Sequence, residues 1–163
     1  MKTLLIVWHS RTGAARQMAE AAARAAEGEA GVAVRLLPAD AAQPQDLMAA
    51  NGYLFAGPEN LAALSGAMKE VFDRCYYPCL ERLNGRPYAM LIAAGSDGEG
   101  AARQLARIAT GWRLKTIAEP LIVCTHAQSP EAIAAAKTVA PEDLARCADL
   151  GQAMAAGLAM GLF

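Results

Sequence analysis

The amino-acid sequence predicts an α/β fold in which helices cover both faces of a five-stranded parallel sheet. Short apolar runs rich in branched residues recur along the 163 residues, and segments with helical spacing separate them. Strands that alternate with helices pair in parallel, and the right-handed crossover rule leaves few topologies for them. The sequence has no internal repeat, linker or break in composition, so we expect a single domain over residues 1–163.

Five runs have the length and composition of strands. They are residues 4–8, 31–37, 52–56, 88–94 and 117–124. The second run alternates in part, and the fifth contains Pro120 near its start, which are features typical of edge strands. Gly57 and Pro58 are expected to end the third strand.

The segments between these runs have helical periodicity. Helices are expected over residues 14–27, 65–77 and 101–112, followed by a last helix that begins at residue 141, and residues 44–50 are expected to form a short helix or turn. Pro78 is expected to disturb the end of the helix over 65–77. Pro141, Glu142 and Asp143 favour a helix start, because proline fits the first turn and carboxylates interact favourably with its positive end. The uncharged stretch after residue 150 is expected to pack on the sheet or on a second subunit.

The charge balance excludes two classes of partner. The formal net charge is -1, so the chain lacks the broad basic surface that binds nucleic acid. It also lacks the strongly acidic surface by which a small carrier docks on basic protein partners. We therefore expect neither nucleic acid nor a strongly basic protein among its partners.

Cysteine usage and hydropathy indicate a cytoplasmic protein. The four cysteines, at 75, 79, 124 and 147, include no C-x-x-C pair and no histidine at zinc-ligand spacing, so no metal site is expected. Reduced thiols fit the cytoplasm best. The first apolar run is too short for a signal peptide. The uncharged C-terminal stretch is shorter than the roughly 20 residues of a membrane span.

The polar octet at residues 9–16 is the turn from the first strand into the first helix. Such a turn directs unpaired backbone N–H groups and the positive end of the helix dipole at one point, where an anion can bind. Ser10 and Thr12 add hydroxyl groups, and Gly13 lets the backbone approach a ligand closely. The octet is neither a G-x-G-x-x-G fingerprint nor a Walker A loop. A simple helix cap is the competing interpretation.

Two further turns are expected at the same edge of the sheet. Residues 57–62 follow the third strand and residues 94–99 follow the fourth, and both are rich in small or turn-forming residues. In an open parallel sheet a ligand binds beyond the carboxyl ends of the strands, where the winding direction reverses. One loop that can hold a phosphate, flanked by two that can grip a flat ring, suggests a mononucleotide with an aromatic base.

Three motifs carry a resemblance to a known family over nearly the whole chain. They are Ser10-x-Thr12-Gly13, then Gly57-Pro58-Glu59-Asn60 with Gly66-x-Met68-Lys69-x-x-x-Asp73-Arg74, and Gly95-Ser96-x-Gly98. In this order and spacing the sequence resembles the flavodoxin-like FMN proteins. Within them it is similar to the small NAD(P)H-dependent FMN and quinone reductases of the WrbA group. The resemblance implies a three-layer αβα sandwich with strand order 2-1-3-4-5.

The resemblance also implies roles for individual residues. It implies FMN as the cofactor, NAD(P)H as electron donor and a small molecule as electron acceptor. The FMN phosphate would be surrounded by Ser10, Arg11, Thr12, Gly13, Ala14 and Ala15. The isoalloxazine would lie along Pro58, Glu59, Asn60 and Leu61, and Gly95, Ser96 and Asp97 would face the ribityl chain or the pyrimidine edge. The redox chemistry itself would belong to the flavin.

Two departures from the family pattern bear on function. Ala15 stands where many flavodoxins have a second hydroxyl residue, so the phosphate would lose one donor. Arg11 is a candidate to compensate by charge, and a solvated arginine is the alternative. The ring loops contain no Trp or Tyr, whereas carrier flavodoxins usually cover the flavin with aromatic side chains. An uncovered ring face would admit a nicotinamide or a quinone, which favours a reductase.

Several alternatives stay open at this point. An electron carrier for a protein partner and a scaffold without bound flavin are the competing functions. His9 either contacts the phosphate or orders the loop. Lys69 and Asp73 form either a surface ion pair or, with Arg74, a support for the ring loop or an interface. Tyr76 and Tyr77 either border a substrate pocket or pack at a helix end. A homo-oligomer is compatible with the uncharged C-terminal helix.

Overall fold

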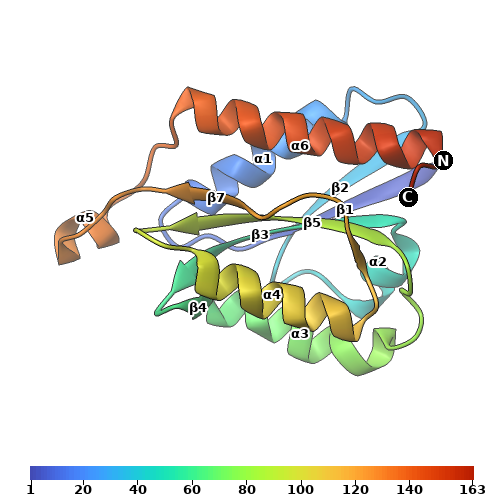
Figure 1. Ribbon diagram of the computed structural model, residues 1–163, viewed down its shortest axis with the longest axis horizontal. Helices are drawn as coiled ribbons and strands as arrows, with labels where there is room; N and C mark the ends of the chain where they lie inside the picture. The colour runs from blue at the N-terminus through green and yellow to red at the C-terminus, as the bar shows by residue number, and fades with distance from the viewer.

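The computed structural model describes residues 1–163 and places one sheet between two helical layers (Figure 1). The strands are β1 (Lys2–Trp8), β2 (Val32–Pro38), β3 (Gly52–Asn60), β4 (Ala63–Leu64), β5 (Pro87–Ala94), β6 (Lys115–Thr116) and β7 (Leu121–Cys124). The helices are α1 (Ala14–Ala26), α2 (Pro44–Ala49), α3 (Gly66–Cys79), α4 (Glu99–Gly111), α5 (Pro130–Ala134) and α6 (Pro141–Met160). Helices α1 and α6 cover one face of the sheet, and α2, α3 and α4 cover the other (Figure 1).

The sheet order confirms the predicted fold class, with one refinement. The strands lie in the order β2-β1-β3-β5, and β5 pairs in parallel with both β6 and β7. Of the predicted fifth strand, residues 117–124, only β7 at residues 121–124 is a strand, and β6 precedes the predicted range. Tyr88 pairs with Thr116 and Leu91 with Leu121, so four residues of the edge strand stand opposite two of β5. The surplus residues include Pro120, which has no N–H to donate to the ladder.

Strand β3 is longer than expected, and the prediction that Gly57 and Pro58 end it is wrong. Pro58 pairs with Ala93 of β5, and the strand continues to Asn60. On its other side, β1 ends opposite Ala56, so no ladder hydrogen bond is required of the Pro58 nitrogen. The extension carries β3 past the sheet, where it pairs in antiparallel fashion with β4.

Two helix boundaries differ from the prediction by two residues, and one helix was not predicted. Helix α3 runs through Pro78 to Cys79, because a proline in the last turn costs only one backbone hydrogen bond. Helix α4 starts at Glu99, two residues earlier than expected. The short helix α5 lies between β7 and α6, where no helix or strand was predicted. None of the helices combines the length and the hydrophobicity that crossing a bilayer requires.

Alternation along β1 divides the core between the two faces of the sheet. Leu4 and Ile6 belong to the cluster under α1 and α6, whereas Leu5 and Val7 belong to the cluster under α2, α3 and α4. Helix α6 packs on α1 so closely that a Cβ added at Gly151 would lie 2.2 Å from the Ala22 carbonyl oxygen. The small residues of α1 make this approach sterically feasible. The last helix therefore packs within the chain itself.

Candidate functional site

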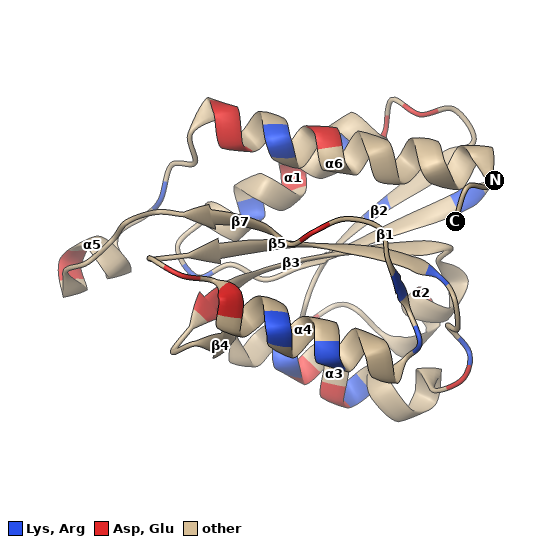
Figure 2. Ribbon diagram, viewed as in Figure 1, with Lys and Arg blue, Asp and Glu red and all other residues tan.

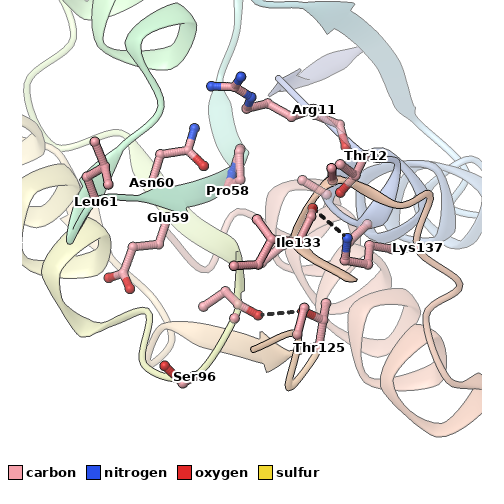
Figure 3. A pocket seen from close by; sticks show the side chains of 18 of the residues that line it. Arg11, Thr12, Pro58, Glu59, Asn60, Leu61, Ser96, Thr125, Ile133 and Lys137 are labelled. Carbon is pink, nitrogen blue, oxygen red and sulfur yellow. Dashed lines mark hydrogen bonds between the residues drawn. The ribbon is translucent and has the colours of Figure 1, made fainter. Parts of the chain in front are cut away.

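The turns after β1, β3 and β5 meet in one cleft at the carboxyl edge of the sheet (Figure 3). Its volume is about 830 Å³, and 19 residues line it. Most of the predicted site residues are in its wall: Ser10, Arg11, Thr12, Ala14, Ala15, Pro58, Glu59, Asn60, Leu61, Gly95 and Ser96. Two are not, Gly13 and Asp97. The structure thus brings residues of all three predicted turns together in one cleft.

Gly13 does not line the cleft but determines the backbone conformation of the turn between β1 and α1. Its φ of 101° is the left-handed conformation that favours glycine, and it is the N-cap of α1. The Ser10 hydroxyl accepts the Gly13 N–H at 3.0 Å, which closes the turn. The first free amides of the helix, at Ala14, Ala15 and Arg16, donate no hydrogen bond within the chain. Ala14 and Ala15 line the cleft, so the positive end of α1 opens onto it.

The second turn is a β-hairpin with a strained tip. Its central residues Leu61 and Ala62 have φ of 50° and 63°, as a tight hairpin turn with two left-handed positions requires. Such turns usually contain asparagine or glycine, and because this one contains neither at its centre, the local sequence does not predict it. Leu61 is fully exposed at the rim of the cleft, where Figure 3 shows it beside Asn60. Strained backbone of this kind is concentrated at functional sites.

Glu59 has a structural role in addition to its place in the cleft wall. Its carboxylate accepts the Gly98 N–H at 2.9 Å and the Ala101 N–H at 3.1 Å, so it caps the start of α4. Its charged oxygens are therefore committed to the protein, and its contribution to the cleft wall is the remainder of the residue. The bond ties the β3–β4 hairpin to the turn after β5. With the α4 start occupied by a carboxylate, α1 is the helix that offers free amides to a ligand.

The third turn contributes two of the three residues that were predicted. Gly95 and Ser96 line the cleft, and the Gly95 carbonyl accepts the His126 N–H at 2.8 Å. Asp97 is exposed and lies outside the wall. At 3.4 Å its carboxylate accepts the N–H of Glu99 in the first turn of α4. Asp97 therefore does not contribute to the cleft wall, although the resemblance implies that it faces the ribityl chain or the pyrimidine edge.

A fourth wall of the cleft comes from residues 125–139, which we call the strap. Its lining residues are Thr125, Ala127, Gln128, Ile133, Ala134 and Lys137, none of which was predicted. The Thr125 N–H and hydroxyl both donate to the Ala94 carbonyl, at 2.8 and 3.2 Å. The only local signal was Ser129-Pro130, in which the Ser129 hydroxyl accepts the Ala132 N–H and starts α5.

Gln17 fixes the strap to the first turn of α1. Its side-chain amide donates to the Gly13 carbonyl at 2.9 Å and to the Lys137 carbonyl at 2.8 Å. Its side-chain oxygen accepts the Val139 N–H at 3.0 Å, and the Lys137 N–H donates to the Thr12 carbonyl at 2.8 Å. The strap is therefore anchored against the turn that was predicted to bind a phosphate.

His9 orders the site from outside the wall. Its Nδ1 lies 2.8 Å from the hydroxyl of Ser65, which is buried at the start of α3. Burial lowers the pKa of His9 below its usual value, the nearby Arg11 lowers it further, and Asp40 opposes the shift. Of the two roles left open by the sequence, the geometry supports the ordering of the loop.

The depressed pKa of His9 predicts that stability falls as the solution becomes acidic. Below about pH 6.5 the unfolded chain binds a proton at this position more readily than the folded chain, so protonation favours unfolding. The free energy of unfolding from urea titrations is expected to fall between about pH 7.5 and 5.5. His9→Asn should reduce this slope. Equal slopes in the wild type and His9→Asn would contradict the assignment.

The remaining candidate residues have structural contacts. Lys69 pairs with Asp73 at 2.6 Å on the surface of α3. Arg74 pairs with Glu70 and donates to the Ala39 and Ala42 carbonyls, so it anchors the segment after β2. Tyr76 stacks on the buried Trp112 with ring centroids 5.8 Å apart, and Tyr77 is exposed. None of the five candidates Lys69, Asp73, Arg74, Tyr76 and Tyr77 lines the cleft.

The cleft carries a net positive charge and has no aromatic lining. Arg11 and Lys137 are its two cationic residues, and neither pairs with a carboxylate. Figure 2 shows acidic segments at the end of β3 and the start of α4, and one basic segment between α5 and α6. The larger apolar side chains that line the cleft are the aliphatic ones of Leu61 and Ile133. No Phe, Trp or Tyr is in the cleft wall.

The doubly wound sheet and its edge cleft define a flavodoxin-like protein. The fold matches the WrbA-like flavodoxin of Agrobacterium tumefaciens with a TM-score of 0.77 and 18% identity, covering 99% of each chain. It matches oxidised flavodoxin 1 of Bacillus cereus with a TM-score of 0.75 and 17% identity, covering 95% of this chain and 97% of that one. The match to rubredoxin:oxygen oxidoreductase of Desulfovibrio gigas has a TM-score of 0.77 and 17% identity, over 99% of this chain and 37% of that one.

Sequence comparison narrows the class to a family. Residues 38–128 match the model of the NADPH-dependent FMN reductase family. The chain belongs to this family, and its family cofactor is FMN. A flavodoxin of Aquifex aeolicus (strain VF5) is 30% identical over 100 residues, which are 61% of this chain. The chain spans about half the length of that curated relative, 54%.

The residues of the cleft fit FMN. The volume of about 830 Å³ lies within the range of roughly 300–1,000 Å³ for small-molecule and cofactor sites. The unpaired amides at the start of α1 are donors for a phosphate group, and the uncompensated charges of Arg11 and Lys137 suit an anion. Pro58 and Leu61 offer apolar surface to a flat ring on the opposite side (Figure 3).

Proposed function

We propose that the protein is an FMN-dependent oxidoreductase that transfers electrons from NAD(P)H to a small flavin, quinone or similar acceptor. The observation that carries the proposal is the large cleft without aromatic cover in a chain of the FMN reductase family. A ring held against aliphatic and backbone groups keeps a face free for a nicotinamide or an acceptor. When bound, FMN supplies the redox chemistry of this reaction.

The chain's own residues bind and orient the cofactor in this proposal. The Ser10 and Thr12 hydroxyls and the amides of Ala14 and Ala15 hold the phosphate, and the left-handed Gly13 keeps them in place. Pro58, Asn60 and Leu61 lie along the ring. Gly95 and Ser96 face the ribityl chain or the pyrimidine edge with backbone groups. Glu59 acts indirectly, because its bonds to α4 set the position of the hairpin.

An electron carrier is the second candidate, and one observation favours it. The 30% identical relative from Aquifex aeolicus is a flavodoxin. The net charge of -1 favours the reductase, because charge steering to a basic partner needs a strongly acidic surface. Steady-state oxidation of NADPH by the purified protein, with free FMN or a quinone as acceptor, supports the reductase. Reduction without turnover would support the carrier instead.

We also propose a cytoplasmic, homo-oligomeric protein. All four cysteines are free thiols, and three of them are buried, as expected in a reducing compartment. The exposed apolar residues Met160, Leu162 and Phe163 at the C-terminus favour contact with a second copy. Sedimentation of the protein with and without FMN tests the oligomer, and a monomer at all concentrations would contradict it.

FMN is expected to stabilise the folded protein strongly. A ligand that binds only the folded state at 100 times its Kd adds about 2.7 kcal/mol to the free energy of unfolding. For a chain of this size that corresponds to a rise in Tm of about 5–10 °C. Thermal unfolding with excess FMN measures the shift, and flavin absorption of the purified protein is an independent check. An unchanged Tm at excess FMN would contradict the flavoprotein assignment.

A further inference from the structure

We propose that Lys137 supplies the cationic partner of the FMN phosphate and that Gln17 positions it. This inference rests on the proposed FMN site and adds a residue from the strap, outside the three turns that carry the family resemblance. The proposal is that the strap, residues 125–139, places the charge of Lys137 against the start of α1, whose own groups are uncharged.

The turn after β1 offers backbone dipoles and hydroxyl groups to a phosphate, but little charge. Its groups at the start of α1 are the amides of Ala14 and Ala15 and the hydroxyls of Ser10 and Thr12. Ala15 has no hydroxyl to donate. A phosphate monoester carries about -1.5 to -2 charges at pH 7, so a site of this kind benefits from a nearby cation.

Lys137 lies where such a cation is needed. Its backbone N–H donates to the Thr12 carbonyl at 2.8 Å, so the residue sits directly on the turn. Its side chain lines the cleft, and Figure 3 shows it beside Thr12. The ammonium donates to the Ile133 and Ala135 carbonyls, at 2.9 and 2.6 Å, and to no carboxylate. Because an ammonium has three N–H donors, one remains for a ligand and the positive charge is uncompensated.

Gln17 makes the placement of Lys137 specific. It lies one helical turn after Gly13 and bonds Gly13, Lys137 and Val139 through both ends of its side-chain amide. A Cβ added at Gly13 would lie 3.8 Å from the Lys137 carbonyl oxygen, which measures how closely the strap approaches the turn. The strap thus cannot shift along the turn without breaking several buried or half-buried hydrogen bonds.

Arg11 is the competing candidate for the cationic partner of the phosphate. The direction of its side chain argues against this role. Figure 3 shows the Arg11 side chain extending across the mouth of the cleft toward Asn60, away from Thr12 and Lys137. Arg11 is also exposed, whereas Lys137 is half-buried. A less exposed charge is less screened by salt and interacts more strongly with a bound anion.

The test compares the affinities of FMN and riboflavin, which differ by the phosphate. Flavin fluorescence quenching gives both Kd values for the wild type, Lys137→Met, Arg11→Met and Lys137→Arg, with Lys115→Met on β6 as the control. Lys137→Met is expected to weaken FMN about ten-fold, as for the loss of a charge-assisted hydrogen bond, and to change riboflavin less than two-fold. Lys137→Arg should keep most of the preference for FMN. The FMN affinity of Lys137→Met should also depend less on salt.

Each outcome bears on the proposal. Equal weakening of FMN and riboflavin by Lys137→Met would show that Lys137 only supports the strap and would overturn it. A loss of FMN affinity in Arg11→Met larger than that in Lys137→Met would assign the charge to Arg11 and overturn the proposal. Wild type that binds neither flavin would contradict the proposed function instead, which keeps the two failures distinct. Gln17→Met should reduce the FMN preference as well, and the Gln17→Met Lys137→Met double variant should lose less than the sum of the two.

Discussion

Gly100→Ala is expected to destabilise the protein and weaken FMN binding, although alanine is the better helix former. A Cβ at Gly100 would lie 2.1 Å from the Ala62 carbonyl oxygen and 2.9 Å from its carbon. Both contacts are with backbone, so the β3–β4 hairpin and α4 must move apart. The hairpin carries Asn60 and Leu61 in the cleft wall, so the displacement reaches the proposed ring site.

The expected size of the effect follows from two opposing terms. Overpacking costs about 3 kcal/mol, and the helix propensity of alanine returns about 1 kcal/mol. The net loss of about 2 kcal/mol corresponds to a fall in Tm of about 5 °C for a chain of this size. The FMN Kd should rise about ten-fold, because the Glu59 bonds to Gly98 and Ala101 shift with the hairpin. Thermal unfolding and flavin fluorescence measure the two quantities.

Gly66→Ala is the matched control for this substitution. Gly66 opens α3 just after the hairpin, is exposed and has no neighbour within 4 Å of an added Cβ. Alanine there is expected to keep the FMN affinity and to stabilise the fold by about 0.5 kcal/mol, because it restricts the unfolded chain. If Gly100→Ala behaves like Gly66→Ala, the hairpin does not depend on its contact with α4.

The sheet could be predicted because its strands are marked locally. Leu4 to Val7 are apolar without interruption, as expected for a central strand buried on both faces, and the alternating periods of strand and helix fix the layer arrangement. The split of the last strand could not be predicted in the same way. Pro120 indicates an edge strand. The two extra residues between β6 and β7, however, become apparent only from the pairing of these strands with β5.

Candidate site residues could be predicted where a turn has a local sequence motif. They were missed where the cleft depends on contacts between residues far apart in the sequence. Ser10, Thr12 and Gly13 indicate a helix start that can hold an anion. In the structure they form one turn at the cleft, as expected. The strap has no such local motif, and it reaches the cleft through Gln17 and Lys137, which are 120 residues apart. The bonds of the Glu59 carboxylate to α4 were not predicted, because this contact becomes visible only when the hairpin and α4 are packed together.

Leu61 and Ala62 illustrate why turn chemistry alone is an incomplete guide. Two left-handed residues without glycine or asparagine are costly, so propensity argues against a tight hairpin at this point. Pairing of Glu59 with Leu64 and of Asn60 with Ala63, together with the contact at Gly100, stabilises the turn nevertheless. The surrounding packing therefore determines a backbone conformation that the local sequence disfavours, as is common at functional sites.

Gly13→Val is expected to remove most FMN binding while leaving the protein folded. At φ 101° a β-branched residue is strained by roughly 1–2 kcal/mol, and its Cβ would lie 3.4 Å from the Gln17 side-chain nitrogen. Relief of the strain rotates the start of α1, so the Ala14 and Ala15 amides no longer point at one position. The FMN Kd should rise about 100-fold, equivalent to about 2.7 kcal/mol. Flavin fluorescence titration measures it, with circular dichroism to confirm folding.

Gly31→Val separates this effect from backbone strain. Gly31 has a φ of 84° and no neighbour within 4 Å of an added Cβ, and it precedes β2, outside the cleft. Valine there incurs a similar strain of roughly 1–2 kcal/mol, so both variants should unfold at similarly reduced temperatures. Only Gly13→Val should lose FMN, because only it moves the amides at the start of α1. Equal FMN affinities in the two variants would mean that the phosphate binds elsewhere than at this turn.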